Sequence, residues 1–155
     1  MRVAILNSAY TFNNGNSSPA ERARGAAMVE FLAADYPRDV RWTEYTPSAG
    51  PALAAARNEL HAAYGISAAA PPQAVVDSLF LASRSLEAGQ PAALPTAVFP
   101  QPSQSLARLS QPIPLPATRV ATAMVERELY RIDNDRVTGG GASGSGGSGG
   151  GGAQP

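Results

Sequence analysis

The sequence predicts an α-rich α+β fold, in which a short N-terminal β element precedes three or four small amphipathic helices. Apolar residues recur at helical spacing in several segments that begin at a proline and end before a glycine. The apolar run nearest the N-terminus is short and continuous, as in a buried strand. Seven prolines lie within residues 91–116 and predict an extended chain there, because proline fixes its own φ and restricts the residue before it.

The order of these segments predicts four parts along the chain. Ten of the fifteen glycines lie between Gly139 and Gly152, and a segment of that composition cannot bury enough apolar area to fold. We therefore expect a small helical or αβ core over residues 1–90, an extended proline-rich strap over 91–117, an amphipathic helix over 118–138 and a disordered Gly/Ser-rich tail over 139–155.

Composition excludes several classes of function. Twelve basic residues balance twelve acidic ones, so we expect neither a nucleic-acid partner nor binding to an anionic membrane surface. The chain has no cysteine, which excludes disulfides, thiolate metal ligands and a cysteine nucleophile. No segment has the apolar length of a signal-peptide core or a transmembrane helix, so we expect a soluble protein, with no compartment indicated.

Two strands are expected in the first part of the chain. Residues 3–6 (VAIL) form the first, and residues 13–18 (NNGNSS) follow as a loop. Residues 39–46 (DVRWTEYT) alternate imperfectly between apolar and charged side chains, as an edge strand does. These two segments are the β element of the predicted fold.

A capping box gives the strongest local signal in the sequence. The hydroxyl of Ser18 can accept from the backbone of Glu21, whose side chain can reach back to the Ser18 amide, and Pro19 occupies the first helical position. The helix that begins here should end before Pro37. Its interior Gly25 should weaken it by about 1 kcal/mol relative to alanine.

Three further helices follow from apolar periodicity and end signals. One should begin at Pro51 and end at Gly65, and the next should begin at Pro72 and end at Glu87, before Gly89. Thr118 should cap the last helix, which covers residues 119–132 and ends at residues 133–135.

The proline-rich strap is apolar as well as extended. It carries a single charged residue, Arg108, and seven large apolar side chains. A segment of that kind lies against a surface, either of its own domain or of a neighbour, and the sequence leaves both possibilities open.

No set of residues has the spacing of a catalytic or metal site. His61 is the only histidine and is expected to be an exposed helix residue, since no cysteine accompanies it in a zinc site. No G-x-S-x-G motif is present, and the closest carboxylate pairs, at positions 126 and 128 and at 133 and 135, lack the arrangement of a general acid and base. We therefore predict no catalytic, cofactor-binding or metal-binding residues.

The N-terminal third offers an alternative. Its expected strand, the loop NSAYTFNNGNSS, the capped helix and the segment DVRWTEY resemble the opening of the flavodoxin-like family of flavin reductases. The resemblance implies a flavin- or nucleotide-binding oxidoreductase in which Asn14, Gly15, Asn16, Ser17 and Ser18 bind a phosphate at the helix N-terminus.

The leading functional hypothesis is a non-enzymatic structural or assembly subunit without a cofactor. Its strap would contact neighbouring subunits, through a protein partner or self-assembly, in a virion or another large complex. A third hypothesis is that the strap docks as polyproline II into a groove of another protein, although its prolines are not spaced as PxxP.

Overall fold

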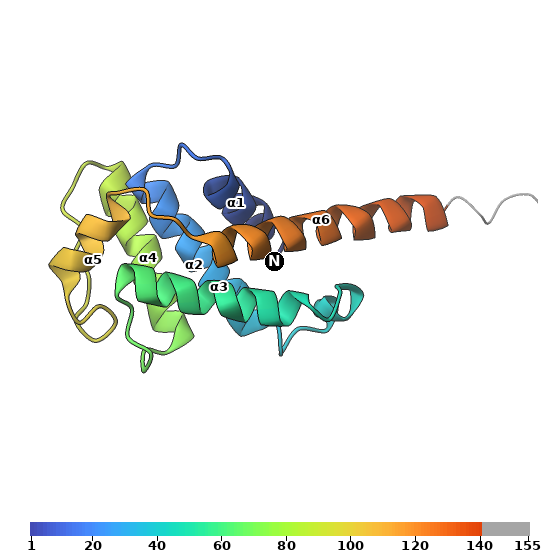
Figure 1. Cartoon of the computed structure of the whole chain (residues 1–155), viewed down its shortest axis with the longest axis horizontal. Helices are drawn as coiled ribbons and strands as arrows, with labels where there is room; N and C mark the ends of the chain where they lie inside the picture. The colour runs from blue at the N-terminus through green and yellow to red at the C-terminus, as the bar shows by residue number, and fades with distance from the viewer. Residues whose placement is uncertain (141–155) are drawn as a thin grey trace, which may run out of the picture.

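The computed structural model describes residues 1–140, in which the regular secondary structure is all helical (Figure 1). The predicted α+β class is wrong, because the described chain contains six α-helices and one 3-10 helix and no strand. The elements are α1 (Arg2–Asn13), α2 (Pro19–Asp35), the 3-10 helix η1 (Val40–Glu44), α3 (Ala49–Tyr64), α4 (Pro72–Glu87), α5 (Pro102–Leu109) and α6 (Pro116–Gly139). Residues 141–155, which include most of the predicted disordered tail, lie outside the described part.

The segment predicted as the first strand is the first turn of α1. The helix buries small and apolar residues at helical spacing along its whole length, among them Ile5, Ala9 and Phe12. A four-residue window around VAIL covers only one turn of that pattern and cannot distinguish it from a strand. Packing of the complete stripe against α2 and α6 decides in favour of the helix.

The second predicted strand is η1 and its flanking turns. Asp39 caps this 3-10 helix by accepting from the Arg41 amide at 2.8 Å. The bonds from Arg41 lower the pKa of Asp39 to about 2. Trp42 is buried between the rings of Tyr36 and Tyr45, with centroids 5.2 and 4.9 Å away. This aromatic cluster, and not strand pairing, orders the segment.

The capping box of α2 is confirmed. The Glu21 amide donates to the Ser18 hydroxyl at 3.1 Å, and the Ser18 amide donates to the Glu21 carboxylate at 2.6 Å. The bond from the Ser18 amide to the carboxylate lowers the pKa of Glu21, because it favours the charged form. The contribution to stability is therefore present above the ordinary pKa of a glutamate and is lost as the pH falls through the lowered value.

The predicted helices in the middle of the chain are also confirmed. α4 has the predicted bounds, and α3 begins at Ala49 instead of Pro51. α3 ends as predicted at Gly65, whose φ of 66° places it in the left-handed conformation common after a helix. Both helices bury the predicted apolar stripes, which contain Leu53 and Leu60 in α3 and Val75 and Leu79 in α4.

The proline-rich segment is not extended throughout, which corrects the strap of the predicted fold. α5 lies in its middle and starts with Pro102 in the first turn, where the missing amide of proline costs little. The segment packs on its own domain: Val98, Phe99, Leu109 and Leu115 are buried in the same core cluster as side chains of α2, α3 and α4. The backbone of Val98 also accepts a hydrogen bond from the Ser67 amide at 2.8 Å.

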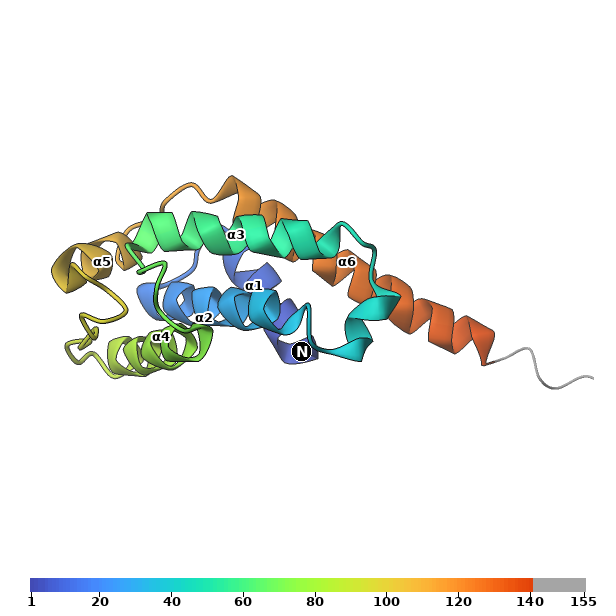
Figure 2. The same ribbon diagram turned by 90° about the horizontal axis from the view of Figure 1, so that it is seen from below.

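α6 is longer than predicted at both ends. Pro116 lies in its first turn, so Thr118 is a buried residue inside the helix instead of its cap. The helix also continues through residues 133–135, where the sequence predicts an end. Figures 1 and 2 show that its C-terminal turns project beyond the other helices.

α2 is the central helix and packs against α1, α3 and α4 (Figure 2). α6 lies against α1 and α3 and closes the other side of the domain. In the part of the chain that the structure describes, no helix is long and apolar enough to cross a membrane.

Gly25 allows the close crossing of α1 and α2. A Cβ at this position would lie 2.7 Å from the Thr11 Cγ2 atom and 3.0 Å from the Phe12 ring. We expect Gly25→Ala to lower the free energy of unfolding by about 1 kcal/mol, because overpacking costs about 1–3 kcal/mol and the helix propensity of alanine recovers about 1 kcal/mol.

Urea denaturation, followed by circular dichroism, measures this change. Gly139→Ala is the matched control, since no atom lies within 4 Å of a Cβ built at that helical glycine. A stabilised Gly25→Ala variant would contradict the close packing of α1 and α2.

Candidate functional site

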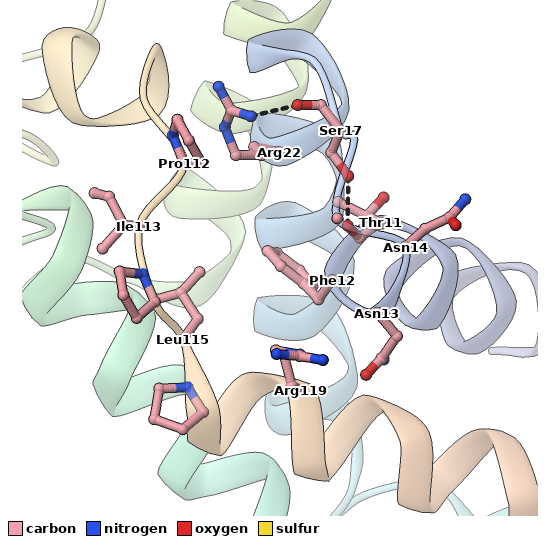
Figure 3. A pocket seen from close by; sticks show the side chains of 13 residues that line it. Thr11, Phe12, Asn13, Asn14, Ser17, Arg22, Pro112, Ile113, Leu115 and Arg119 are labelled. Carbon is pink, nitrogen blue, oxygen red and sulfur yellow. Dashed lines mark hydrogen bonds between the residues drawn. The ribbon is translucent and has the colours of Figure 1, made fainter.

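A cavity lies between the α1–α2 loop and the chain that enters α6 (Figure 3). Its volume is about 470 Å³. Residues from the end of α1, the loop 14–17 and the start of α2 form one wall, and residues 112–116 with the first turn of α6 form the other. We call this cavity the loop cleft.

One wall of the loop cleft is polar and is held by local hydrogen bonds. The side-chain amide of Asn13 donates to the Ala9 carbonyl and to the Thr122 hydroxyl, both at 3.0 Å. The Ser17 hydroxyl donates to the Thr11 carbonyl (Figure 3). The bond from Ser17 fixes the loop to α1, and the bond from Asn13 to Thr122 connects the end of α1 to α6.

The opposite wall is apolar and stiff. Pro112, Pro114 and Pro116 alternate with Ile113 and Leu115 along it. The three prolines have fixed φ angles and no backbone N–H to donate. Leu115 is buried and Ile113 is half-buried, so this wall presents hydrocarbon surface to the cavity.

Two guanidinium groups line the loop cleft. The Nε atom of Arg22 donates to the Leu109 carbonyl at 2.8 Å, and its terminal nitrogen donates to the Ser17 carbonyl. Arg119 is exposed, and its guanidinium makes no hydrogen bond or ion pair with residues 1–140. No aspartate or glutamate is among the residues that line the cavity.

Glu21 and Glu59 lie next to lining residues of the cleft, but their carboxylates form hydrogen bonds outside it. Glu21 belongs to the capping box of α2. Glu59, from α3, accepts from the amides of Ala117 and Thr118 at 3.1 and 2.7 Å, and from the Thr118 hydroxyl at 2.8 Å. The N-terminal amides of α6 are thus occupied by a carboxylate of the protein itself.

The structure separates the residues of the predicted phosphate loop. Asn14, Gly15 and Ser17 line the loop cleft, whereas Asn16 and Ser18 do not. Ser18 caps α2. The sheet that a flavodoxin-like fold requires is absent from residues 1–140, so the resemblance to that family does not extend to the fold.

Glu30 is the one charged residue buried within residues 1–140, and it lies away from the loop cleft, where α2 packs against α3. The Glu30 side chain is 3% exposed, and its two oxygens are 2.8 Å from Arg57 Nε and 2.7 Å from His61 Nε2. The expectation that His61 is an exposed helix residue is wrong, since its side chain is 13% exposed and hydrogen-bonded. This group connects α2 to α3, and none of its three residues lines the loop cleft.

Two buried tyrosines are the remaining polar candidates. The hydroxyls of Tyr45 and Tyr64 have no hydrogen-bond partner within the described chain. Burial raises the pKa of Tyr64 to about 12, so this phenol remains protonated at neutral pH and is unsuited to act as a base.

Within residues 1–140, no group of three or more histidine, cysteine or acidic side chains is arranged to hold a metal ion. Sequence reasoning missed the loop cleft because it joins residues about a hundred positions apart, such as Arg22 and Arg119. The only local signal was the alternation of proline with isoleucine and leucine in residues 112–116. The sequence matches no protein-family model, curated protein or solved structure.

Proposed function

We propose that this chain is a non-enzymatic assembly subunit, and that its contact element is the projecting end of α6. The observation that supports this proposal is the exposure of large apolar side chains on a helix that extends past the domain (Figure 1). Tyr130 is 54% exposed and Val137 is 77% exposed. Ile132 is the last buried residue of the helix.

Tyr130 and Val137 lie on one face of α6, because a separation of seven residues corresponds to about two helical turns. The charged side chains between these two residues are paired within the described chain. Arg131 bonds to Asp135 at 2.9 Å and to Glu128 at 2.9 Å, and Arg136 bonds to Glu44 at 2.5 Å. A partner can therefore cover the apolar face without burying an unpaired charge from these groups.

The occupant that we propose for this face is α6 of a second copy. In an antiparallel pair of helices, Tyr130 of each copy lies against Val137 of the other, so one pair of contacts occurs twice, as an isologous dimer requires. The formal net charge at pH 7 is zero, and electrostatic repulsion between copies is accordingly weak.

The proline-rich segment no longer supplies the contact in this proposal. Its large apolar side chains at positions 94, 98, 99, 109 and 115 are buried in the domain itself. A neighbour would have to compete with that core to reach them, whereas the exposed face of α6 is accessible without any rearrangement.

Size-exclusion chromatography with light scattering, over a series of concentrations, tests the proposal. We expect the mass of the full chain to rise from one copy to two with concentration, and Val137→Asp to keep the protein at one copy, because the substitution places a charge in the apolar contact.

Val40→Asp is the matched control, since Val40 is also 77% exposed but lies on η1. Circular dichroism of both variants shows whether the domain remains folded. A wild-type mass of one copy at every concentration would refute self-assembly, and equal loss of the dimer in both variants would place the contact elsewhere.

A further inference from the structure

The loop cleft combines positive charge with an apolar wall, and the proposed assembly through α6 uses neither. Arg22 and Arg119 approach the cavity from opposite ends, with Phe12, Ile113 and Leu115 between them (Figure 3). The projecting end of α6 is at the far end of that helix from Arg119 (Figure 1), so the two features can be tested separately.

No carboxylate lines the cleft, and neither of its two arginines forms an ion pair within residues 1–140. Arg22 donates only to carbonyl oxygens, which satisfy its N–H groups without neutralising it. Arg119 has no partner among residues 1–140, and the carboxylate of Glu59 is bound to backbone amides of α6. A guanidinium in this setting is suited to a carboxylate, sulfonate or phosphate, which it can bind through two parallel hydrogen bonds.

The apolar part of the cavity surface determines what can accompany the acidic group of a ligand. Ile113, Leu115 and the rings of the prolines cover one side, and the ring of Phe12 lies across from them on the α1 side (Figure 3). The other residues of the α1 side and the loop are Thr11, Asn13, Asn14, Gly15 and Ser17. A cavity of about 470 Å³ falls within the range of about 300–1,000 Å³ that small-molecule sites occupy. An inorganic ion would leave most of this volume unused.

From these observations we infer that the loop cleft binds a small amphipathic anion, an aromatic or aliphatic body that carries an acidic group. Arg119 binds the acidic group, Arg22 adds to the positive potential, and the wall of residues 112–116 covers the apolar body. The walls of the site are preorganised by hydrogen bonds. The Asn13 side chain is bonded to α1 and α6, and Arg22 is bonded to Leu109 at the end of α5.

Fluorescence titration with anilinonaphthalene sulfonate, an aromatic anion, tests the site on the full chain. Its neutral analogue phenylnaphthylamine supplies the apolar body without the charge, and inorganic phosphate supplies the charge without the body. We expect one sulfonate site per chain, weaker binding of the neutral probe, and no displacement by phosphate at concentrations comparable to the probe.

The variant Arg119→Gln should weaken sulfonate binding about tenfold, as the loss of a charge-assisted hydrogen bond does, and leave binding of the neutral probe unchanged. Arg127→Gln, on the exposed face of the same helix, is the matched control and should behave as the wild type. Because neither guanidinium has a hydrogen-bond partner in the described residues, both variants should unfold at the wild-type temperature.

Ile113→Asp supplies a second variant, which places a negative charge on the apolar wall and should abolish sulfonate binding. Sulfonate binding that is unchanged by Arg119→Gln, equal affinity for the neutral probe, or displacement by phosphate alone would each overturn the inference. The result is independent of assembly, because the stoichiometry is measured per chain and Val137→Asp should bind the probe normally.

Discussion

Replacing Phe99 with alanine is expected to lower the free energy of unfolding by about 3–5 kcal/mol, the cost of removing a fully buried phenylalanine side chain. Phe99 lies in the proline-rich segment and is 0% exposed. It packs in the core cluster that contains Tyr64 and Leu79, and its amide donates to the Pro95 carbonyl at 2.8 Å.

Urea denaturation of the full chain, followed by circular dichroism, measures the effect of this substitution. Thr96→Ala is the control, because Thr96 lies in the same turn and is exposed; its effect should remain within about 0.5 kcal/mol. A loss of less than about 1 kcal/mol for Phe99→Ala would mean that the proline-rich segment does not belong to the core, and would return it to the role of a contact with a neighbour.

The second large effect is expected for Glu30→Ala, at about 3 kcal/mol. The substitution leaves Arg57 and His61 without their shared partner at the interface of α2 and α3. Removal of one member of a buried ion pair is costly because the other charge stays desolvated. Since 31% of the Arg57 side chain is exposed, it can turn partly toward water, and we expect the lower end of the usual range.

Glu87→Ala provides the comparison for this effect. Glu87 pairs with Arg24 of α2, but both side chains are well exposed, so the loss should be between about 0 and 1 kcal/mol. Glu30→Gln retains the volume and a hydrogen-bond acceptor and should fall between the two alanine variants. Equal effects of Glu30→Ala and Glu87→Ala on the unfolding midpoint in urea would show that the buried group does not clamp the helices.

Helices with strong end signals could be predicted from the sequence. The capping box at Ser18 and the left-handed glycine at Gly65 act through neighbouring residues, so their meaning does not depend on the rest of the fold. The strand predicted at residues 3–6 failed for the opposite reason. Val3 and Ile5 are β-branched and favour strands, but burial of the longer stripe of α1 outweighs this local preference.

The buried Glu30 group and the loop cleft are formed by residues far apart in the sequence, so no local sequence pattern predicts them. Glu30 in α2 bonds to His61 in α3, and Arg119 and Asn14 line one cavity only because α6 packs against α1. The prolines predicted an extended segment, which α5 interrupts, and their spacing gives no indication of the surface on which the segment lies.

The two ends of α6 differ in how they can open, because Glu59 is bonded only to its start. Its first turn is attached to α3 by a carboxylate, so opening it requires the disruption of the domain as a whole. Its last turns after Ile132 contain no buried residue and are tied to the domain only by the exposed ion pairs of Asp133 with Arg2 and of Arg136 with Glu44, so they can open while the core stays folded. One continuous helix therefore couples a globally stable anchor to a locally adjustable end, and a partner that orders this end stabilises it without straining the core.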